Sequence, residues 1–186
     1  MRLTGTLMVL GLLASSQIAM AAGTGQVNGS VSLKGHVTNQ ICTLGTVNAN
    51  DSIFNVGVLV DTGTGYLSSN LAVPPKILSG SFCNTKSVIS IVATPMKAQD
   101  VGASAPSGFS QAVDYTATAS GWTTTPAAYT TSAAANPGAS QIRPTAFSGD
   151  ITVSLSNFAT TGGNTLRLVS DPLYQGIVTI TLAASS

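Results

Sequence analysis

The sequence predicts an all-β protein built as a sandwich of β-sheets. Apolar and polar residues alternate with a period of two along most of the chain, which is typical of half-buried strands. No segment shows a convincing helical spacing of apolar residues. Residues that favour turns separate the alternating runs, so the strands are expected to be short and numerous.

The expected strands follow one another from the middle of the chain to its end. In one of them Ile151, Val153 and Leu155 fall on a single face, which indicates a strand with one buried side. Thr161–Asn164 and Asp171-Pro172 are turn signals between the last strands. The expected strands are Ser52–Val60, Lys76–Cys83, Ser87–Thr94, Val113–Ala119, Asp150–Phe158, Thr165–Ser170 and Leu173–Leu182.

Two stretches are expected to be long loops, Pro95–Ala112 and Gly121–Phe147. The second is of low complexity in Thr, Ala and Ser, and it contains Trp122, the single tryptophan of the chain. A solvated, variable loop and a functional loop both fit this composition.

The N-terminus has the features of a secretory signal. Met1-Arg2 is a short basic start, Leu3–Ala14 is an apolar stretch, and Ala19–Ala21 supplies the small residues that signal peptidase recognises. The apolar stretch is too short and wrongly flanked for a membrane anchor. We expect residues 1–21 to be a signal peptide, with cleavage after Ala22 as the alternative, and the mature chain to be exported.

Charge is scarce. Charged residues make up 7% of the chain, against roughly 25% in an average soluble domain. Loss of Arg2 with the signal leaves six basic and six acidic side chains, and all six acids are Asp. This balance offers no attraction for nucleic acid or for an anionic membrane surface. A surface so poor in charge favours packing of the protein beside copies of itself.

The two cysteines, Cys42 and Cys83, are expected to form one disulfide because the chain is exported to an oxidising compartment. The bridge would close a loop of about 40 residues, and in the chain-entropy model this contributes roughly 4 kcal/mol to stability. Two free buried thiols are the less favoured alternative.

The stretch GQVNGSVSLKGHVTNQIC, residues 25–42, alternates like a strand but carries glycines on its apolar face. One explanation is the first strand of an ordinary sandwich, and another is a hairpin turn at Asn28-Gly29. The run is long for a strand of about 5–6 residues, which favours a leading arm (22–36) before a domain (37–186). The apolar face consists of Val27, Gly29, Val31, Leu33, Gly35 and Val37.

No pattern in the sequence points to catalysis. His36 is the single histidine and lies on the polar face of the arm, so it is expected to be an exposed strand residue. The sequence shows no His/Cys cluster with the spacing of metal ligands and no phosphate-binding glycine loop. We therefore expect no enzyme activity, no cofactor and no metal.

The segment VNGSVSLKGHVTNQIC, together with a second cysteine some forty residues later, resembles the N-terminal extension and first cysteine of the type 1-like chaperone-usher pilins. The close resemblance covers about 20 residues. The size of the chain, its all-β pattern and its cysteine spacing extend the resemblance loosely over the remainder.

This resemblance implies an immunoglobulin-like β-sandwich that lacks its last strand and is completed by a donor strand from a neighbouring subunit. It implies that a periplasmic chaperone lends a strand during folding, and that at an outer-membrane usher the arm of the next subunit replaces it. The implied donor-strand residues are Val27, Gly29, Val31, Leu33 and Gly35.

The last strand of such pilins lines the acceptor groove and binds the chaperone. By alternation, the corresponding face here carries Tyr174, Gly176, Val178, Ile180 and Leu182. Pilins of this family usually carry a penultimate tyrosine, whereas this chain ends in TLAASS. This difference points to a divergent branch of the chaperone-usher pilins, such as the archaic or spore-coat-U-like branch.

The expected function is that of a structural subunit of a surface pilus, or fimbria, which supports adhesion and is exported through the periplasm to the cell surface. Its expected partners are other pilin subunits, the chaperone and the usher. The alternative is a secreted, self-contained β-sandwich that binds a glycan or receptor through the loop containing Trp122 and Tyr129.

Overall fold

The computed structural model describes residues 32–47, 52–102 and 104–185. The chain divides into two units, Met1–Val37 and Thr38–Ser186. In the first, residues 32–37 have no strand partner and are exposed. The expected signal peptide, residues 1–21, lies outside the described residues, as do Val27, Gly29 and Val31 of the expected arm.

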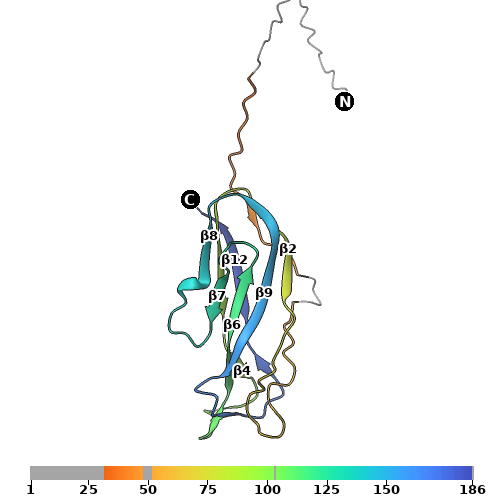
Figure 1. Cartoon of the computed structure of the whole chain (residues 1–186), viewed down its shortest axis with the longest axis vertical. Helices are drawn as coiled ribbons and strands as arrows, with labels where there is room; N and C mark the ends of the chain where they lie inside the picture. The colour runs from red at the N-terminus through yellow and green to blue at the C-terminus, as the bar shows by residue number, and fades with distance from the viewer. Residues whose placement is uncertain (1–31, 48–51, 103, 186) are drawn as a thin grey trace, which may run out of the picture. The chain divides into compact units, whose positions relative to one another are not determined.

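The larger unit contains a curled seven-stranded sheet in which all paired strands are antiparallel. Its order is β1-β2-β9-β6-β4-β11, and β7 pairs with β6 (Figure 1). The strands are β1 (Cys42–Thr43), β2 (Lys76–Cys83), β4 (Met96–Ala98), β6 (Ala112–Ser120), β7 (Ala127–Thr130), β9 (Phe147–Thr160) and β11 (Tyr174–Gln175).

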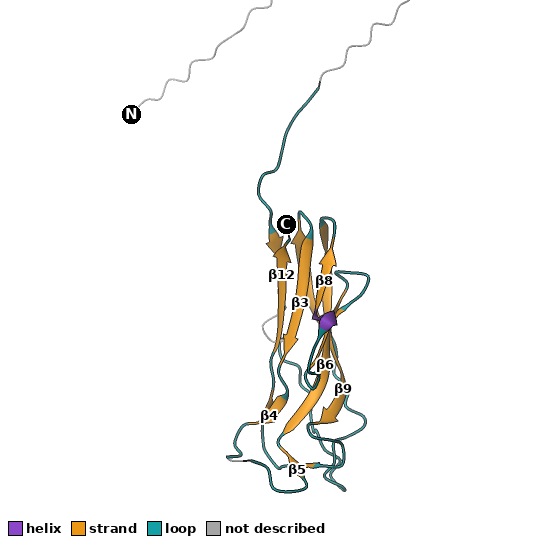
Figure 2. Ribbon diagram, turned by 90° about the vertical axis from the view of Figure 1, so that its left-hand side faces the viewer, coloured by secondary structure: helices purple, strands orange, loops and turns teal. Residues whose placement is uncertain are grey.

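A second sheet has three antiparallel strands in the order β12-β3-β8, and Figure 2 shows them side by side. These are β12 (Val178–Ala184), β3 (Ser87–Ala93) and β8 (Ser140–Arg143). The short strands β5 (Phe109–Ser110) and β10 (Arg167–Leu168) form a small parallel pair. Pro137–Ala139 is a single turn of 3-10 helix, and the described ranges contain no α-helix. The prediction of an all-β fold is confirmed.

The core lies between the two sheets because the strands alternate as their sequences predict. Ile89 and Ile91 of β3 are fully buried, and so are Val113 of β6 and Ile151 of β9. These side chains belong to one hydrophobic cluster, so the inner faces of the two sheets pack against each other. This arrangement is consistent with the predicted β-sandwich.

Trp122 closes one end of the core. Its indole is completely buried, and its Nε1–H donates a hydrogen bond of 3.1 Å to Oγ of Ser87. The ring of Phe147 meets it edge-on, with 5.2 Å between the ring centroids. The guanidinium of Arg143 lies 3.5 Å from the centroid of Phe147 and donates to the main-chain oxygen of Trp122. This end of the molecule is therefore filled by interlocking aromatic and cationic side chains.

Several expected segments differ from the structure, and of the expected strand Thr165–Ser170 only β10 forms. The expected loop Gly121–Phe147 contains β7 and β8, and the expected loop Pro95–Ala112 contains β4 and β5. The expected strand Ser52–Val60 is not a regular strand: it begins in a bend and forms one isolated bridge, between Val60 and Leu67. Gly57 interrupts its alternation with a φ of +75°, a left-handed conformation that favours glycine.

The predicted disulfide between Cys42 and Cys83 is confirmed, with a sulfur–sulfur distance of 2.03 Å. The two cysteines are directly opposite partners of β1 and β2. Just beyond them, the chain lies so close to β2 that a Cβ atom at Gly45 would be 2.2 Å from the main-chain oxygen of Ser79. The Gly45 N–H donates to Oγ of Ser81 at 2.9 Å. Residues 42–45 are thus fastened tightly along β2.

We predict that Gly45→Ala lowers the free energy of unfolding by about 2 kcal/mol, because the added methyl group forces main chain away from main chain. Urea unfolding of the oxidised protein measures the change. Gly102→Ala is the matched control, since no atom lies within 4 Å of a Cβ added there. Equal effects of the two substitutions would contradict the close approach at Gly45.

We predict a loss of stability at high pH that depends on Tyr115. Burial raises the pKa of its hydroxyl to about 12, whereas an unfolded tyrosine ionises near pH 10, so the unfolded chain releases its proton first. The free energy of unfolding should therefore fall as the pH rises from about 10 to about 12, with no contribution from this group at lower pH. In Tyr115→Phe, urea unfolding should show a flatter decline over this range; an unchanged slope would refute the assignment.

Candidate functional site

β12 forms one edge of the three-stranded sheet. On one side it pairs with β3 over its full length, and no strand pairs with its other side among the residues that the structure describes. The residues that flank β12 form main-chain hydrogen bonds with the ends of β3. Thr94 N–H donates to the Ile177 oxygen, and Ser185 N–H donates to the Lys86 oxygen, both at 2.9 Å. Alternate residues of an antiparallel strand bond to the same side. The main-chain groups of Val178, Ile180 and Leu182 therefore point toward the open edge.

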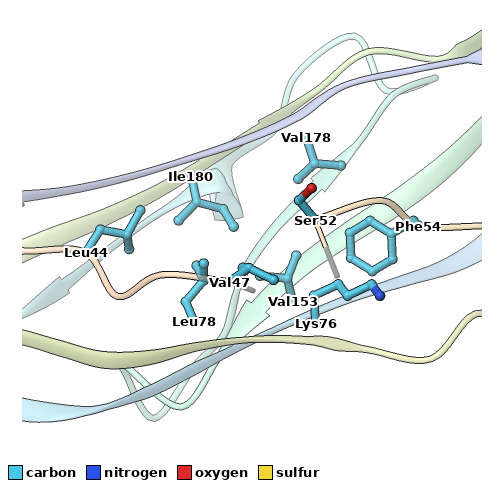
Figure 3. Close-up of a pocket in the computed structure, with 9 residues that line it drawn as sticks. All are labelled: Leu44, Val47, Ser52, Phe54, Lys76, Leu78, Val153, Val178 and Ile180. Carbon is cyan, nitrogen blue, oxygen red and sulfur yellow. The ribbon is translucent and has the colours of Figure 1, made fainter. Parts of the chain in front are cut away.

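An apolar groove of about 210 Å³ lies beside this open edge. Figure 3 shows Val178 and Ile180 of β12 on one side of it and Leu78 of β2 on the other. The segment between β1 and Phe54 contributes further apolar side chains. The complete lining is Leu44, Val47, Ser52, Phe54, Lys76, Leu78, Val153, Val178 and Ile180.

The groove is formed by core positions that the sandwich leaves partly uncovered. Leu78 and Val153 are buried, whereas Leu44, Val178 and Ile180 are only partly buried although they pack against the core cluster. Among the described residues of the lining, Lys76 is the one cationic side chain, and none carries a carboxylate or an imidazole. Such a surface offers hydrophobic burial together with unpaired backbone groups along one rim, which is the combination that binds an extended peptide strand.

The expected last strand is divided in two. Tyr174 lies in β11 and pairs with Ala98 of β4 in the larger sheet, and its hydroxyl donates to the Val169 oxygen at 2.9 Å. Gly176 lies in the crossing between the sheets, where an added Cβ would be 2.7 Å from the Thr94 oxygen. Tyr174 and Gly176 therefore do not line the groove.

The remaining members of that predicted set lie in β12. Val178 and Ile180 line the groove, while Leu182 packs against the core farther along the strand. Of the predicted donor-strand residues, Leu33 and Gly35 are within the described range. The side chain of Leu33 is 97% exposed, and nothing lies within 4 Å of a Cβ added to Gly35.

Sequence reasoning missed five apolar residues of the lining. Alternation in the strand runs indicated that two of them face the core, but it did not show that a groove would leave them accessible. The others precede β2 in segments that carry no clear strand pairing. The five are Leu44, Val47, Phe54, Leu78 and Val153.

The alternative site at Trp122 and Tyr129 is not supported by the geometry. Trp122 is completely buried against Ser87 and Phe147, so its ring has no face on which a sugar could stack. Tyr129 is half-buried in β7, where it pairs with Ala117. Trp122 therefore belongs to the end of the core, and the alternative of a ligand-binding loop stays a prediction.

Other features of the described part of the chain are weaker candidates for a functional site. A hollow of about 350 Å³ has a mixed polar and apolar lining that includes Lys97, Phe109 and Thr161. His36 is exposed in an extended segment. A search of the described residues finds no group of three or more potential metal ligands. Within the same residues no helix is long and apolar enough to cross a membrane.

We predict that the groove binds an environment-sensitive apolar dye when the chain lacks residues 22–35. Ile180→Asp should reduce the dye fluorescence by more than half, because a carboxylate would enter the apolar lining. The matched control is Thr181→Asp, which places the same charge on the exposed face of the same strand. Circular dichroism checks that both variants fold, and equal dye binding by the two folded variants would contradict the assignment.

Comparison of the chain with protein-family models, with curated proteins and with solved structures gives no match in any of the three. The groove beside β12 is accordingly interpreted from its own geometry and chemistry.

Proposed function

We propose that this protein is a structural subunit of a surface pilus, which polymerises by donor-strand complementation and supports adhesion. The observation that carries the proposal is the apolar groove beside the unpaired edge of β12. In this proposal the fold is an immunoglobulin-like sandwich without its last strand, and the N-terminal arm of a neighbouring subunit supplies that strand.

The arm and the groove are complementary in pattern. A strand added at the edge of β12 would pair with the main chain of Val178, Ile180 and Leu182 and direct alternate side chains into the groove. Alternate side chains of a strand lie about 6.8 Å apart. Val31 and Leu33 on the apolar face of the arm are two positions apart, so they would have this spacing in an inserted strand.

Insertion of the arm would be driven by burial of apolar side chains and by main-chain pairing. Burying the side chains of Val27, Val31 and Leu33 contributes about 2 kcal/mol each, or roughly 6 kcal/mol together, before the costs of association. Main-chain hydrogen bonds along β12 add to this and also satisfy its open edge. The glycines at positions 29 and 35 let the inserted main chain approach the neighbour closely.

The proposed route of assembly follows from the need to cover the apolar groove and the open edge of β12. Before a neighbour arrives, the groove must be covered by another strand, which in this proposal a periplasmic chaperone provides until an outer-membrane usher exchanges it for the arm. A signal peptide in residues 1–21 would direct export. The Cys42–Cys83 disulfide is compatible with an oxidising periplasm and with a final location on the cell surface.

We predict that the chain beginning at Ala22 forms polymers that survive SDS without boiling and dissociate on heating, and that a chain lacking residues 22–35 does not. Val31→Asp should abolish the ladder, because it would place a carboxylate in the groove. Ser32→Asp, on the opposite face of the arm, is the matched control and should leave the ladder intact.

A further variant tests where the arm binds. The arm sequence, deleted from the N-terminus and fused through a short linker after the C-terminus, should fill the groove of its own chain and give a stable monomer. Arm-independent polymers, or a monomer from every variant including the unmodified chain, would overturn the proposed function.

A further inference from the structure

The disulfide closes a loop that contains much of the groove. Cys42 and Cys83 are separated by 41 positions, and the chain between them includes the wall formed by Leu44, Val47 and Phe54. It also includes Leu78 of β2, the strand along which this part of the wall runs. Of the lining residues, only Val153, Val178 and Ile180 lie outside this loop.

Residues 39–41 lie immediately before the disulfide, and the side chain of Asn84 forms hydrogen bonds with their main chain. Asn84 accepts a hydrogen bond from Ile41 N–H through Oδ1 and donates one to the Asn39 oxygen through Nδ2, both at 2.8 Å. Its own N–H donates to the Ile41 oxygen at 3.0 Å. Residues 39–41 are thereby aligned with Asn84, directly ahead of Cys42.

The non-covalent attachment beyond this point is short. β1 contains only two residues, and the attachments to β2 that follow it within residues 44–47 are one isolated bridge, Thr46 to Ser79, and the bond from Gly45 to Ser81. If the arm were pulled and the disulfide were absent, these contacts would be loaded one after another. The next residues drawn away would be Leu44 and Val47, which form a wall of the groove.

With the disulfide intact, tension takes a different path. It passes from Cys42 through the two sulfur atoms to Cys83, which is 2% exposed and is paired with Phe147 at the start of β9. β9 is 14 residues long and pairs with β2 on one side and β6 on the other. Residues 43–82 then carry no tension, although they include the wall of the groove.

We infer that the Cys42–Cys83 disulfide is a mechanical bypass, which carries tension from the subunit's own arm into the β2–β9 pair and keeps the groove closed around the strand donated by a second copy of the chain. The inference rests on the proposed function, because only in a fibre is the arm under tension while the groove is occupied. It gives the disulfide a role beyond restricting the unfolded chain.

The test measures the lifetime of a donor peptide, residues 22–36, in the groove of the chain beginning at Ala22, with and without tension on that chain's arm. In the oxidised protein the lifetime should be the same in both conditions. In the double variant Cys42→Ala/Cys83→Ala, tension should shorten the lifetime roughly tenfold or more relative to the unloaded variant, as the wall is drawn away. Asn84→Ala is the matched control: it removes the side-chain bonds at the entrance, leaves the disulfide, and should behave like the wild type.

A second arrangement keeps the test decisive if the cysteine-free variant fails to fold. In the oxidised protein, the handle through which tension is applied is moved from the arm to a non-canonical residue that replaces Thr46. Thr46 is exposed and lies inside the loop that the disulfide closes. Tension applied there acts on the wall directly and should shorten the donor lifetime despite the intact disulfide. Equal lifetimes with the handle on the arm and at position 46 would overturn the bypass, and so would equal sensitivity to tension in the oxidised and cysteine-free chains. Absence of donor binding at zero force would instead overturn the proposed function.

Discussion

The structure depends most on how the open side of β12 is satisfied. Val178, Ile180 and Leu182 direct main-chain donors and acceptors toward this side, while Val178 and Ile180 turn their side chains into an apolar groove. Unpaired main-chain groups next to apolar surface are costly when water is excluded, and an exposed edge invites another strand. The proposed donor strand would solve both problems, because it would pair with β12 and fill the groove.

The contrast with the Trp122 end shows that the opening is local. There the indole, the ring of Phe147 and the guanidinium of Arg143 fill the space between the sheets, and Ser87 accepts the indole hydrogen bond. Beside β12 the described lining is mostly aliphatic, with Phe54 as an aromatic member, and it leaves a groove of about 210 Å³. The core is therefore filled at the Trp122 end, whereas a groove remains beside β12.

The sequence indicated the strands better than their partners. Alternation placed Lys76–Cys83 at the same bounds as the observed β2, and Asp150–Phe158 inside the longer β9, because a half-buried strand shows its buried face locally. The break between Tyr174 and Val178 could not be predicted in the same way, since both halves alternate. What separates them is the close approach of Gly176 to the Thr94 oxygen, a contact between residues far apart in the chain. The disulfide was predictable because two cysteines permit one pairing.

The groove itself was only half predictable. Val178 and Ile180 follow from alternation in the last strand, but Leu44 and Phe54 line the groove because the chain after β1 crosses beside β2 without forming a regular strand. That path depends on the fit of Gly45 against Ser79, which period-two alternation does not record. Local pattern thus gives the residues that share one face of the last strand, the resemblance to pilins gave that face its expected role, and the shape of the site arises from tertiary contacts.

In the sheets, hydroxyl groups take the place of the scarce charged side chains. On the outer faces, hydroxyls bond across strands, as Thr116 does with Thr130 at 2.9 Å and Ser90 with Ser140 at 2.8 Å, so these surfaces are polar without being ionic. Proteins commonly protect a free edge with lysine, proline or a bulge. β12 has the sequence VTITLAA, and its seven residues stay in unbroken register with β3. An edge that carries none of these protections is suited to accept a strand, and its sequence is therefore an independent argument that β12 is made to be paired.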